Sequence, residues 1–453
     1  MTQNNTSQPQ DYRVMGFWRV WALAVGCAIG SGIFMMPTLL APYGMLGLSS
    51  WLVAGAGTVL IALTFARLAT RIPKTGGLYI YADSGLGAMA GFIVGWCYWI
   101  SCLTAVASVA IAFISYLSAY VPILAEHNQA GLIACLGLIW LIIGLNIRSV
   151  KGSSIFQVIT TILKIAPLLI LAALGLINMQ PEMLPEYNPT ELSPIAAISA
   201  ATMLVMWSFL GIESATVPAG NVIQPEKTIP RAIIASVLTI LVLYILVSLA
   251  VNLTVSTSEL KDSTAPFKLA AERLMGPIGA IVVTLGALLS TLGSLNANTL
   301  MCGQMPMAIA TNGLFPKRFK RLSKNGTPTF GLLVSGAIVS VLLIMNYTKG
   351  LIGAFTFLVM MATLATLMAY TLCAIAEFYF LKQDKPSAAR NRAIILGIGT
   401  FVYSLFCILG AGQEIVFYSF FLILLGLPIY ALQRKPKTMS ESETSINEEL
   451  LSD

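Results

Sequence analysis

One lysine stands inside one of the most apolar stretches of the chain. Residues 158–177 read VITTILKIAPLLILAALGLI, and Lys164 lies well within them. On a helix that begins near residue 153, Lys164 lies about 16 Å from the start. That is too far for the side chain to reach either membrane interface. A charged lysine at mid-span costs about 3 kcal/mol or more, so we expect its ammonium group to occupy a cation site or to exchange a proton.

The neighbours of this lysine indicate which way it faces. Gln157, Thr160, Thr161 and Lys164 follow the spacing i, i+3, i+4 and i+7, which places them on one helix face. Such a polar stripe is expected to face the interior of a helix bundle rather than lipid. Glu213 is the one acidic residue that we expect at mid-membrane depth. No spacing argument joins it to Lys164, although an ion pair between them is one option.

Two apolar segments are poor helices at their centres. The first contains VGCAIGSGIFMMP, with Gly30, Gly32 and Pro37, and the second contains MWSFLGIESATVPAG, with Gly211 and Pro218. Glycine in a helix interior costs about 1 kcal/mol, so these segments are expected to unwind locally. The alternative is that the small residues only permit close packing between helices.

Unwinding would supply binding groups of both polarities. Free N–H and C=O groups persist at membrane depth only where they line a cavity. The N-terminus of a half-helix favours an anion, and freed carbonyls favour a cation. The backbone of an amino acid carries both charges, so the two interrupted segments predict a site for a zwitterion.

The composition requires a bundle of membrane helices to hold these segments. The chain has 453 residues, of which 57% are hydrophobic and 10% charged, and its mean hydropathy is +0.83. Soluble domains carry about 25% charged residues. Long continuous apolar runs predict an all-α polytopic membrane protein. We expect twelve transmembrane helices, at 17–40, 45–69, 88–120, 130–147, 153–178, 196–221, 231–253, 277–311, 328–346, 351–380, 392–410 and 414–433.

Basic residues predict the orientation. With the N-terminus inside, cytoplasmic segments contain 21 of the 26 lysine and arginine residues, and outer loops contain four. This asymmetry predicts an even number of spans, both termini in the cytoplasm, and a location in the cell (inner) membrane. The net charge of +7 is then a topology signal and gives no indication of nucleic-acid binding. The sequence contains no Walker motif, so ATP-driven transport is not indicated. The seven cysteines do not have the spacing of a metal site.

The interrupted segments are the first and sixth spans, which indicates an internal repeat. A unit with an odd number of spans is inverted when it repeats, and matching broken helices mark transporter binding sites. The expected organisation is a cytoplasmic tail at 1–16, a first repeat at 17–178 and a second at 196–380. Two further spans at 392–433 and an acidic cytoplasmic tail at 434–453 complete the chain.

Several motifs resemble those of a known family. GSGIF at 30–34, PKTGGLYIYA at 73–82 and WSFLGIESATVPAGNVIQPEKTIPRA at 207–232 are similar to amino acid–polyamine–organocation (APC) superfamily transporters. STAPF at 263–267 and NGLFPKRF at 312–319 add to the resemblance. It is closest to the bacterial basic amino acid/polyamine antiporter branch, which contains the arginine/agmatine antiporter. The resemblance implies the LeuT-like five-plus-five inverted repeat and alternating access around a central site.

The resemblance also implies the residues of that site. The substrate carboxylate would meet backbone N–H groups near Ser31, Gly32 and Ile33. The substrate ammonium would meet carbonyls near Ala28, Trp207 and Leu210. Trp207 would also cap the substrate, unless it is an ordinary packed tryptophan, and Glu213 would act in gating or proton sensitivity.

Two positions depart from the pattern of the arginine antiporter. Asn298 stands where that branch has a pocket-lining tryptophan, and Val106 stands where the arginine antiporter has an asparagine. Groups that would hold a guanidinium are therefore absent, which weakens the case for arginine/agmatine exchange.

Relatives that do not use sodium suggest a second role for Lys164. Several carry a lysine in the fifth span where sodium-coupled relatives bind the ion. Its ammonium would tie the fifth span to the unwound first span and to the eighth, whose nearest hydroxyls are Ser290, Thr291 and Ser294. Proton exchange and a permanent structural charge both fit such a lysine, and sodium coupling is the third alternative.

These observations predict a sodium-independent secondary amino acid transporter, working as a proton symporter or as an exchanger. A neutral or small amino acid is favoured over arginine. The alternatives are a cationic amino acid or polyamine antiporter and a non-transporting receptor or scaffold. An enzyme is not expected, nor is a cofactor or metal. The expected partners are the amino acid substrate, protons and the lipid bilayer, with the chain acting as a monomer or homodimer.

Overall fold

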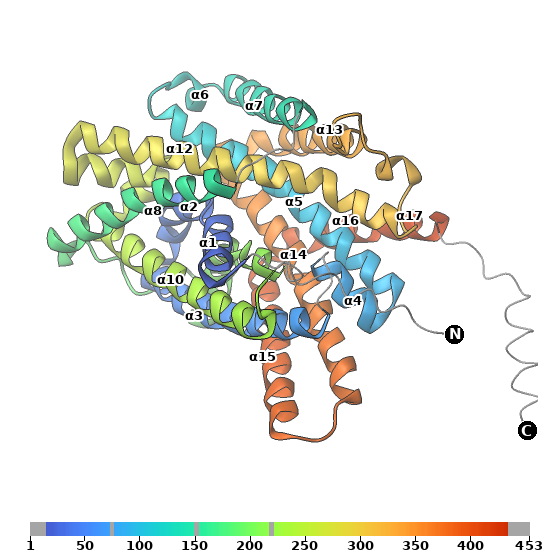
Figure 1. Ribbon diagram of the computed structural model, residues 1–453. Helices are drawn as coiled ribbons and strands as arrows, with labels where there is room; N and C mark the ends of the chain where they lie inside the picture. The colour runs from blue at the N-terminus through green and yellow to red at the C-terminus, as the bar shows by residue number, and fades with distance from the viewer. Residues whose placement is uncertain (1–14, 73–76, 149–153, 217–221, 434–453) are drawn as a thin grey trace, which may run out of the picture.

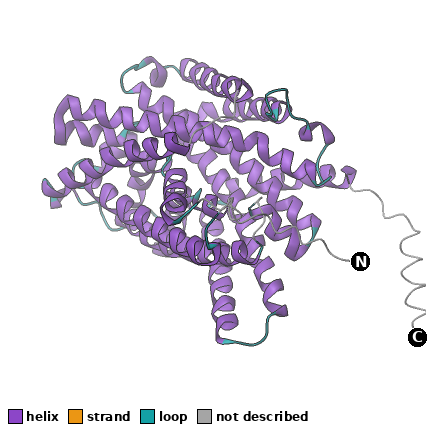
Figure 2. Ribbon diagram, in the orientation of Figure 1, coloured by secondary structure: helices purple, strands orange, loops and turns teal. Residues whose placement is uncertain are grey.

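The computed structural model describes residues 15–72, 77–148, 154–216 and 222–433, with side chains for all of these except 154–163. Helices joined by short loops make up this part of the chain, and no strand is drawn in it (Figure 2). The first eight helices are α1 (Phe17–Ala28), α2 (Gly32–Leu40), α3 (Gly44–Arg71), α4 (Leu78–Leu86), α5 (Ala88–Ser118), α6 (Ile123–Glu126), α7 (Asn128–Arg148) and α8 (Ser154–Ile177).

The described residues of the second half form nine α-helices. They are α9 (Pro194–Met206), α10 (Pro225–Asn252), α11 (Thr257–Asp262), α12 (Pro266–Thr311), α13 (Thr329–Asn346), α14 (Gly350–Gln383), α15 (Ala388–Gly410), α16 (Gln413–Leu424) and α17 (Gly426–Gln433). Helix α12 contains a kink at Gly276, whose φ of 67° is not helical. The span predicted at 277–311 therefore begins directly after this kink.

Eight helical stretches of the described residues are long and apolar enough to cross a membrane, and three shorter apolar helices accompany them. Two of the eight, Gly32–Arg71 and Thr329–Gln383, each combine segments that we predicted as separate spans. The predicted all-α polytopic class is confirmed. The number of twelve spans and the inverted repeat stay predictions.

Helix α5 runs through the middle of the bundle. It packs against α12 on one side and α14 on the other (Figure 1). Most of its residues are buried, and the helix is apolar around its whole circumference. A helix of that composition is stable only when other helices cover every face. The remaining helices surround this central element, with α1 and α2 lying beside α10 and α3.

An ion pair joins α3 to α14 at the end of the bundle that is predicted to be cytoplasmic. Arg67 Nε lies 2.9 Å from Glu377 Oε1, and the Glu377 side chain is only 2% exposed. One turn further along, Arg71 pairs with Asp384, and both of these side chains are partly exposed. Glu377 is therefore shielded from water, whereas Arg67 and both members of the outer pair are partly exposed.

Candidate functional site

The first predicted span is interrupted, as expected from its glycines. Helix α1 ends at Ala28, and Ile29 takes an extended conformation with φ −75° and ψ 90°. Helix α2 then begins at Gly32, with Ser31 at its N-cap. The last carbonyls of α1 and the first N–H groups of α2 consequently lack their usual intrahelical partners.

The sixth predicted span is also interrupted. Helix α9 tightens into a 3₁₀ turn at Trp207–Phe209, and Leu210 is extended, with φ −65° and ψ 143°. Gly211 has φ 105°, in a region that glycine adopts without the strain caused by a side chain. A further 3₁₀ turn follows at Ile212–Thr216. The predicted breakers Pro218 and Gly220 lie outside the described residues.

The two interruptions pack directly against each other. A Cβ atom added to Gly211 would lie 3.0 Å from the carbonyl oxygen of Cys27, at the end of α1. A Cβ atom added to Gly32 would lie 2.6 Å from Ser208 Oγ. Glycine at both positions therefore permits a close approach that larger residues would prevent.

Lys164 contacts the interruption of the first span. Its side chain is buried, and Nζ donates to the carbonyl oxygens of Ile29 at 3.1 Å and Gly26 at 3.5 Å. Ser290 Oγ, from α12, lies 3.4 Å from the same Ile29 oxygen. The ammonium group therefore points at backbone carbonyls inside the bundle. The side chains of Gln157, Thr160 and Thr161, which completed the predicted stripe, lie outside those that the structure describes.

The other predicted hydroxyls of α12 are arranged differently. Thr291 donates to Ala287 and Leu288 in its own helix, so it does not reach the lysine. Ser294 faces the interruption, because a Cβ atom added to Gly30 would lie 2.7 Å from its Oγ. Asn298 donates to the Ser294 carbonyl at 2.9 Å and so places its amide along α12.

Glu213 is held by groups from three segments. Its Oε1 accepts from the Tyr98 hydroxyl of α5 at 3.2 Å. Its Oε2 accepts from the Tyr370 hydroxyl of α14 at 2.8 Å and from the Gly211 N–H at 2.9 Å. The carboxyl group is buried, and this set of donors ties the sixth-span interruption to the central helices. No ion pair in the described part of the chain joins Glu213 to Lys164.

The remaining predicted residues gather at the same place. Ala28, Ile33 and Trp207 are buried, and Leu210 is half-buried. The hydroxyls of Ser31, Ser208 and Ser214 are buried without a hydrogen-bond partner in the described residues. An unpaired buried polar group costs about 1–3 kcal/mol, so hydroxyls in this condition are available to a polar ligand.

Sequence reasoning missed three contributors to this site: Tyr244, Tyr370 and Ser208. Tyr244 donates from α10 to the Ala28 carbonyl at 3.3 Å, where α1 ends. A tyrosine inside an apolar run needs a partner for its hydroxyl, and this signal could have identified both tyrosines. Ser208 had no comparable signal, since serine is common at helix interfaces in membranes.

The described residues contain no group of three or more histidine, cysteine, aspartate or glutamate side chains that could hold a metal ion. The site is instead built from backbone groups, hydroxyls, one ammonium and one carboxyl group. These groups lie inside a multi-pass bundle, which is the arrangement of a membrane protein that handles a small polar solute.

Comparison with known proteins specifies the class. The model of the amino acid permease family matches residues 15–437, and the chain therefore belongs to this family within the APC superfamily, as its motifs predicted. It is similar to the putrescine transporter PotE of Escherichia coli K12, with 29% identity over 92% of this chain and 95% of the relative. It is also similar to a putative amino-acid transporter of Clostridium perfringens strain 13, with 29% identity over 96% of this chain and 94% of the relative. A putative arginine/ornithine antiporter of Bacillus subtilis 168 is 28% identical over 92% of this chain and 96% of the relative.

Proposed function

We propose that this permease is a sodium-independent secondary amino acid transporter that works by alternating access, as a proton symporter or an amino acid exchanger. The observation that carries the proposal is that two interrupted helices pack against each other and a buried lysine contacts the first of them. Lys164 Nζ lies 3.1 Å from the Ile29 carbonyl oxygen, within the first interruption. Broken helices at matching positions of two repeats are where secondary transporters bind substrates and coupling ions.

The substrate carboxylate would bind at the start of α2. The N–H groups of Ser31, Gly32 and Ile33 belong to the first turn of this helix or its cap, where the helix dipole favours an anion. The unpaired hydroxyls of Ser31 and Ser208 add two donors beside them. The substrate ammonium would bind the carbonyls of Ala28, Trp207 and Leu210. The Ala28 carbonyl already accepts from Tyr244, but each carbonyl oxygen has two lone pairs.

Lys164 would take the place of a sodium ion. Carbonyls of an unwound helix are the groups that coordinate sodium in coupled transporters, and here an ammonium group donates to two of them. A fixed ammonium removes the need for sodium. The same group would carry a proton in a symporter, or stay charged throughout the cycle in an exchanger.

Glu213 would act in gating. Its carboxyl group connects the sixth-span interruption to α5 through Tyr98 and to α14 through Tyr370. Any movement of the interruption against these helices must break or exchange these hydrogen bonds.

The pattern of helix contacts supports an inverted repeat of 17–178 and 196–380. When the helices are numbered by predicted spans, several contacts have a counterpart five spans later. Helix α1 contacts α10, and their counterparts α9 and α3 are also in contact. The contact of α5 with α14 is matched by that of α12 with α8, and the contact of α5 with α13 is matched by that of α12 with α7. Pairs of corresponding contacts are what a pseudo-two-fold axis produces.

Charge asymmetry supports the orientation. With 21 of 26 basic residues on one side, both termini would lie in the cytoplasm and the chain in the inner membrane. The tails 1–16 and 434–453 fall almost entirely outside the described residues. A monomer or a homodimer would be sufficient, since the site is formed within one chain.

A second candidate is a cationic amino acid or polyamine antiporter, and the names of the relatives from E. coli and B. subtilis favour it. The residues favour a neutral amino acid. Glu213 is the one buried carboxyl group at the interruptions, and its oxygens already accept three hydrogen bonds. A diamine also lacks the carboxylate that the start of α2 would bind.

Uptake into proteoliposomes tests these alternatives. Radiolabelled neutral amino acids, ornithine, arginine and putrescine would be supplied with a sodium gradient, a proton gradient, or unlabelled substrate inside. We expect accumulation of a neutral amino acid that does not change when sodium is replaced. A requirement for sodium, or transport of putrescine alone, would overturn the proposal. Saturable binding without uptake or exchange would identify a receptor instead.

A further inference from the structure

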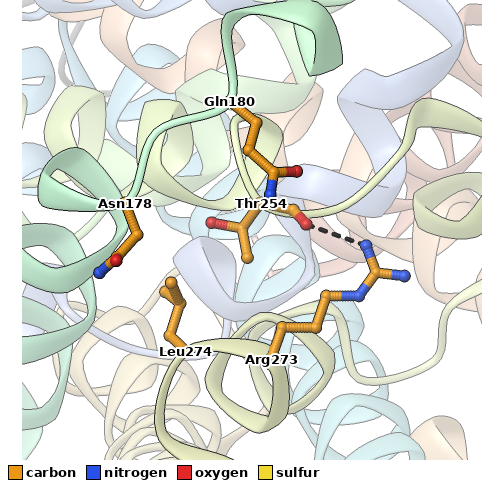
Figure 3. A pocket seen from close by; sticks show the side chains of 5 residues that line it. All are labelled: Asn178, Gln180, Thr254, Arg273 and Leu274. Carbon is orange, nitrogen blue, oxygen red and sulfur yellow. Dashed lines mark hydrogen bonds between the residues drawn. The ribbon is translucent and has the colours of Figure 1, made fainter.

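A polar pocket lies away from the interrupted helices, where α8 and α10 end and α12 begins. It has a volume of about 440 Å³ and is lined by Asn178, Gln180, Thr254, Arg273 and Leu274. Figure 3 shows these side chains arranged around one space, with the Arg273 guanidinium at its edge. The volume lies within the range of about 300–1,000 Å³ that is typical of small-molecule sites.

The polar groups of this pocket have hydrogen-bonding capacity to spare. Arg273 Nη1 donates to the Thr254 carbonyl oxygen at 2.9 Å, and Nη2 pairs with Glu259. A guanidinium has five N–H donors, so three remain. The side-chain amide of Gln180 has no partner among the described residues.

Glu259 contributes a stable negative charge beside the arginine. The Ser256 hydroxyl donates to its carboxylate, and this hydrogen bond, together with the Arg273 guanidinium, lowers the pKa of Glu259 below its ordinary value. Both members of the pair are partly exposed. Arg273 and two side-chain amides therefore line the pocket itself, and the negative charge of Glu259 lies next to it through the pair with Arg273.

The pocket borders the surface that faces lipid. Ile177 at the end of α8 is 77% exposed, and Ile278 just after the kink in α12 is 78% exposed. Met179 is also exposed beside Asn178 and Gln180, and exposed leucines continue along α8 and α12. Exposed apolar side chains on membrane helices contact acyl chains, so the polar pocket lies at the depth of the headgroups.

We propose that this pocket binds the zwitterionic headgroup of a phospholipid with a primary ammonium, such as phosphatidylethanolamine. The phosphate would bind the free N–H groups of Arg273, because guanidinium and phosphate form charge-assisted hydrogen bonds. The ammonium would donate to Glu259 and to the Gln180 amide oxygen. An anionic headgroup would meet Glu259 without a compensating cation, and a choline headgroup has no N–H to donate.

Lipid retention tests this proposal independently of transport. The full-length protein would be reconstituted in nanodiscs with equal amounts of phosphatidylethanolamine, phosphatidylcholine and phosphatidylglycerol, extracted in mild detergent, and its retained lipid quantified by mass spectrometry. We expect phosphatidylethanolamine to be enriched, and Arg273→Gln to lower that enrichment about tenfold, as expected for the loss of a charge-assisted contact. Lys268→Gln is the matched control, because Lys268 pairs with Glu272 on the same helix outside the pocket.

A pocket-filling variant and a competition experiment complete the test. Asn178→Trp would fill the pocket while leaving the Arg273–Glu259 pair in place, and it should also abolish the enrichment. Soluble phosphoethanolamine at millimolar concentration should not displace the lipid; displacement would assign the pocket to a soluble zwitterion. Equal retention of the three lipids, or undiminished enrichment in both pocket variants, would overturn the proposal.

Discussion

The carbonyl oxygen of Ile29 lies 3.1 Å from Lys164 Nζ and 3.4 Å from Ser290 Oγ. One backbone group at the interruption between α1 and α2 therefore joins side chains from α8 and α12. A free carbonyl at membrane depth requires a partner, and here the partner carries a positive charge. This contact is the basis of our proposal that the transporter operates without sodium.

Gly211→Ala should destabilise the sixth-span interruption. Alanine is strained at a φ of 105°, and its Cβ would lie 3.0 Å from the Cys27 carbonyl oxygen. We expect a loss of about 1–3 kcal/mol in the free energy of unfolding, measured as a lower thermal unfolding temperature in detergent, together with reduced uptake.

Two other glycines separate strain from close approach. Gly313 has φ 76° with no atom within 4 Å of an added Cβ, so Gly313→Ala should show strain alone. Gly137 in α7 has open space and an ordinary helical backbone, and Gly137→Ala should cost nothing. If Gly211→Ala behaves like Gly137→Ala, the tight packing of the two interruptions is refuted.

Glu213→Gln should weaken the link between the interruption and the central helices. The glutamine amide has one accepting oxygen where the carboxyl group has two, so it cannot accept from Tyr98, Tyr370 and the Gly211 N–H as Glu213 does now. A hydrogen bond contributes about 0.5–1.5 kcal/mol to stability, so a loss of about that size is expected. Uptake should fall as well, because the movement of the interruption depends on this link.

A double-mutant cycle identifies the partner. Tyr370→Phe removes one donor, and combining it with Glu213→Gln should cost less than the sum of the two single changes. Strict additivity of the two unfolding free energies would show that the hydroxyl and the carboxyl group do not interact.

Arg67→Ala should leave the Glu377 carboxyl group buried without its cation. Oε2 of Glu377 already lacks a partner in the described residues. Removing one member of a buried pair costs about 3–5 kcal/mol, and the lower end applies because Arg67 is more than a third exposed. Arg71→Ala is the control: its partner Asp384 is partly exposed, so the cost should stay below about 1 kcal/mol. Thermal unfolding in detergent measures both, and equal losses would contradict the difference in burial.

Local signals predicted the interruptions well. Glycines act through their own backbone, so the breaks after Ala28 and at Gly211 follow from residue type. The apolar run at 88–120 likewise became α5, which ends within two residues of the prediction. The position of Lys164 followed from the cost of burying a charge, since a bundle interior with free carbonyls is where an ammonium group is tolerated.

Contacts between distant segments were not predictable in the same way. The pairing of Glu213 with Tyr98 and Tyr370 depends on how three helices cross, and nothing in their spacing encodes it. The place of Asn298 in the pocket stays a prediction; its amide donates to a carbonyl within α12. An asparagine in a helix has this local option, and sequence alone does not decide between it and a ligand.

Uptake by Lys164→Ala in proteoliposomes tests the central claim most directly. The variant should remain monodisperse and unfold cooperatively, while substrate uptake falls at least about tenfold or loses its response to a proton gradient. Lys349→Ala, which changes an exposed lysine paired with Glu414, should transport normally. Uptake by Lys164→Ala with the kinetics and pH dependence of the unmodified protein would contradict the role assigned to the buried ammonium group.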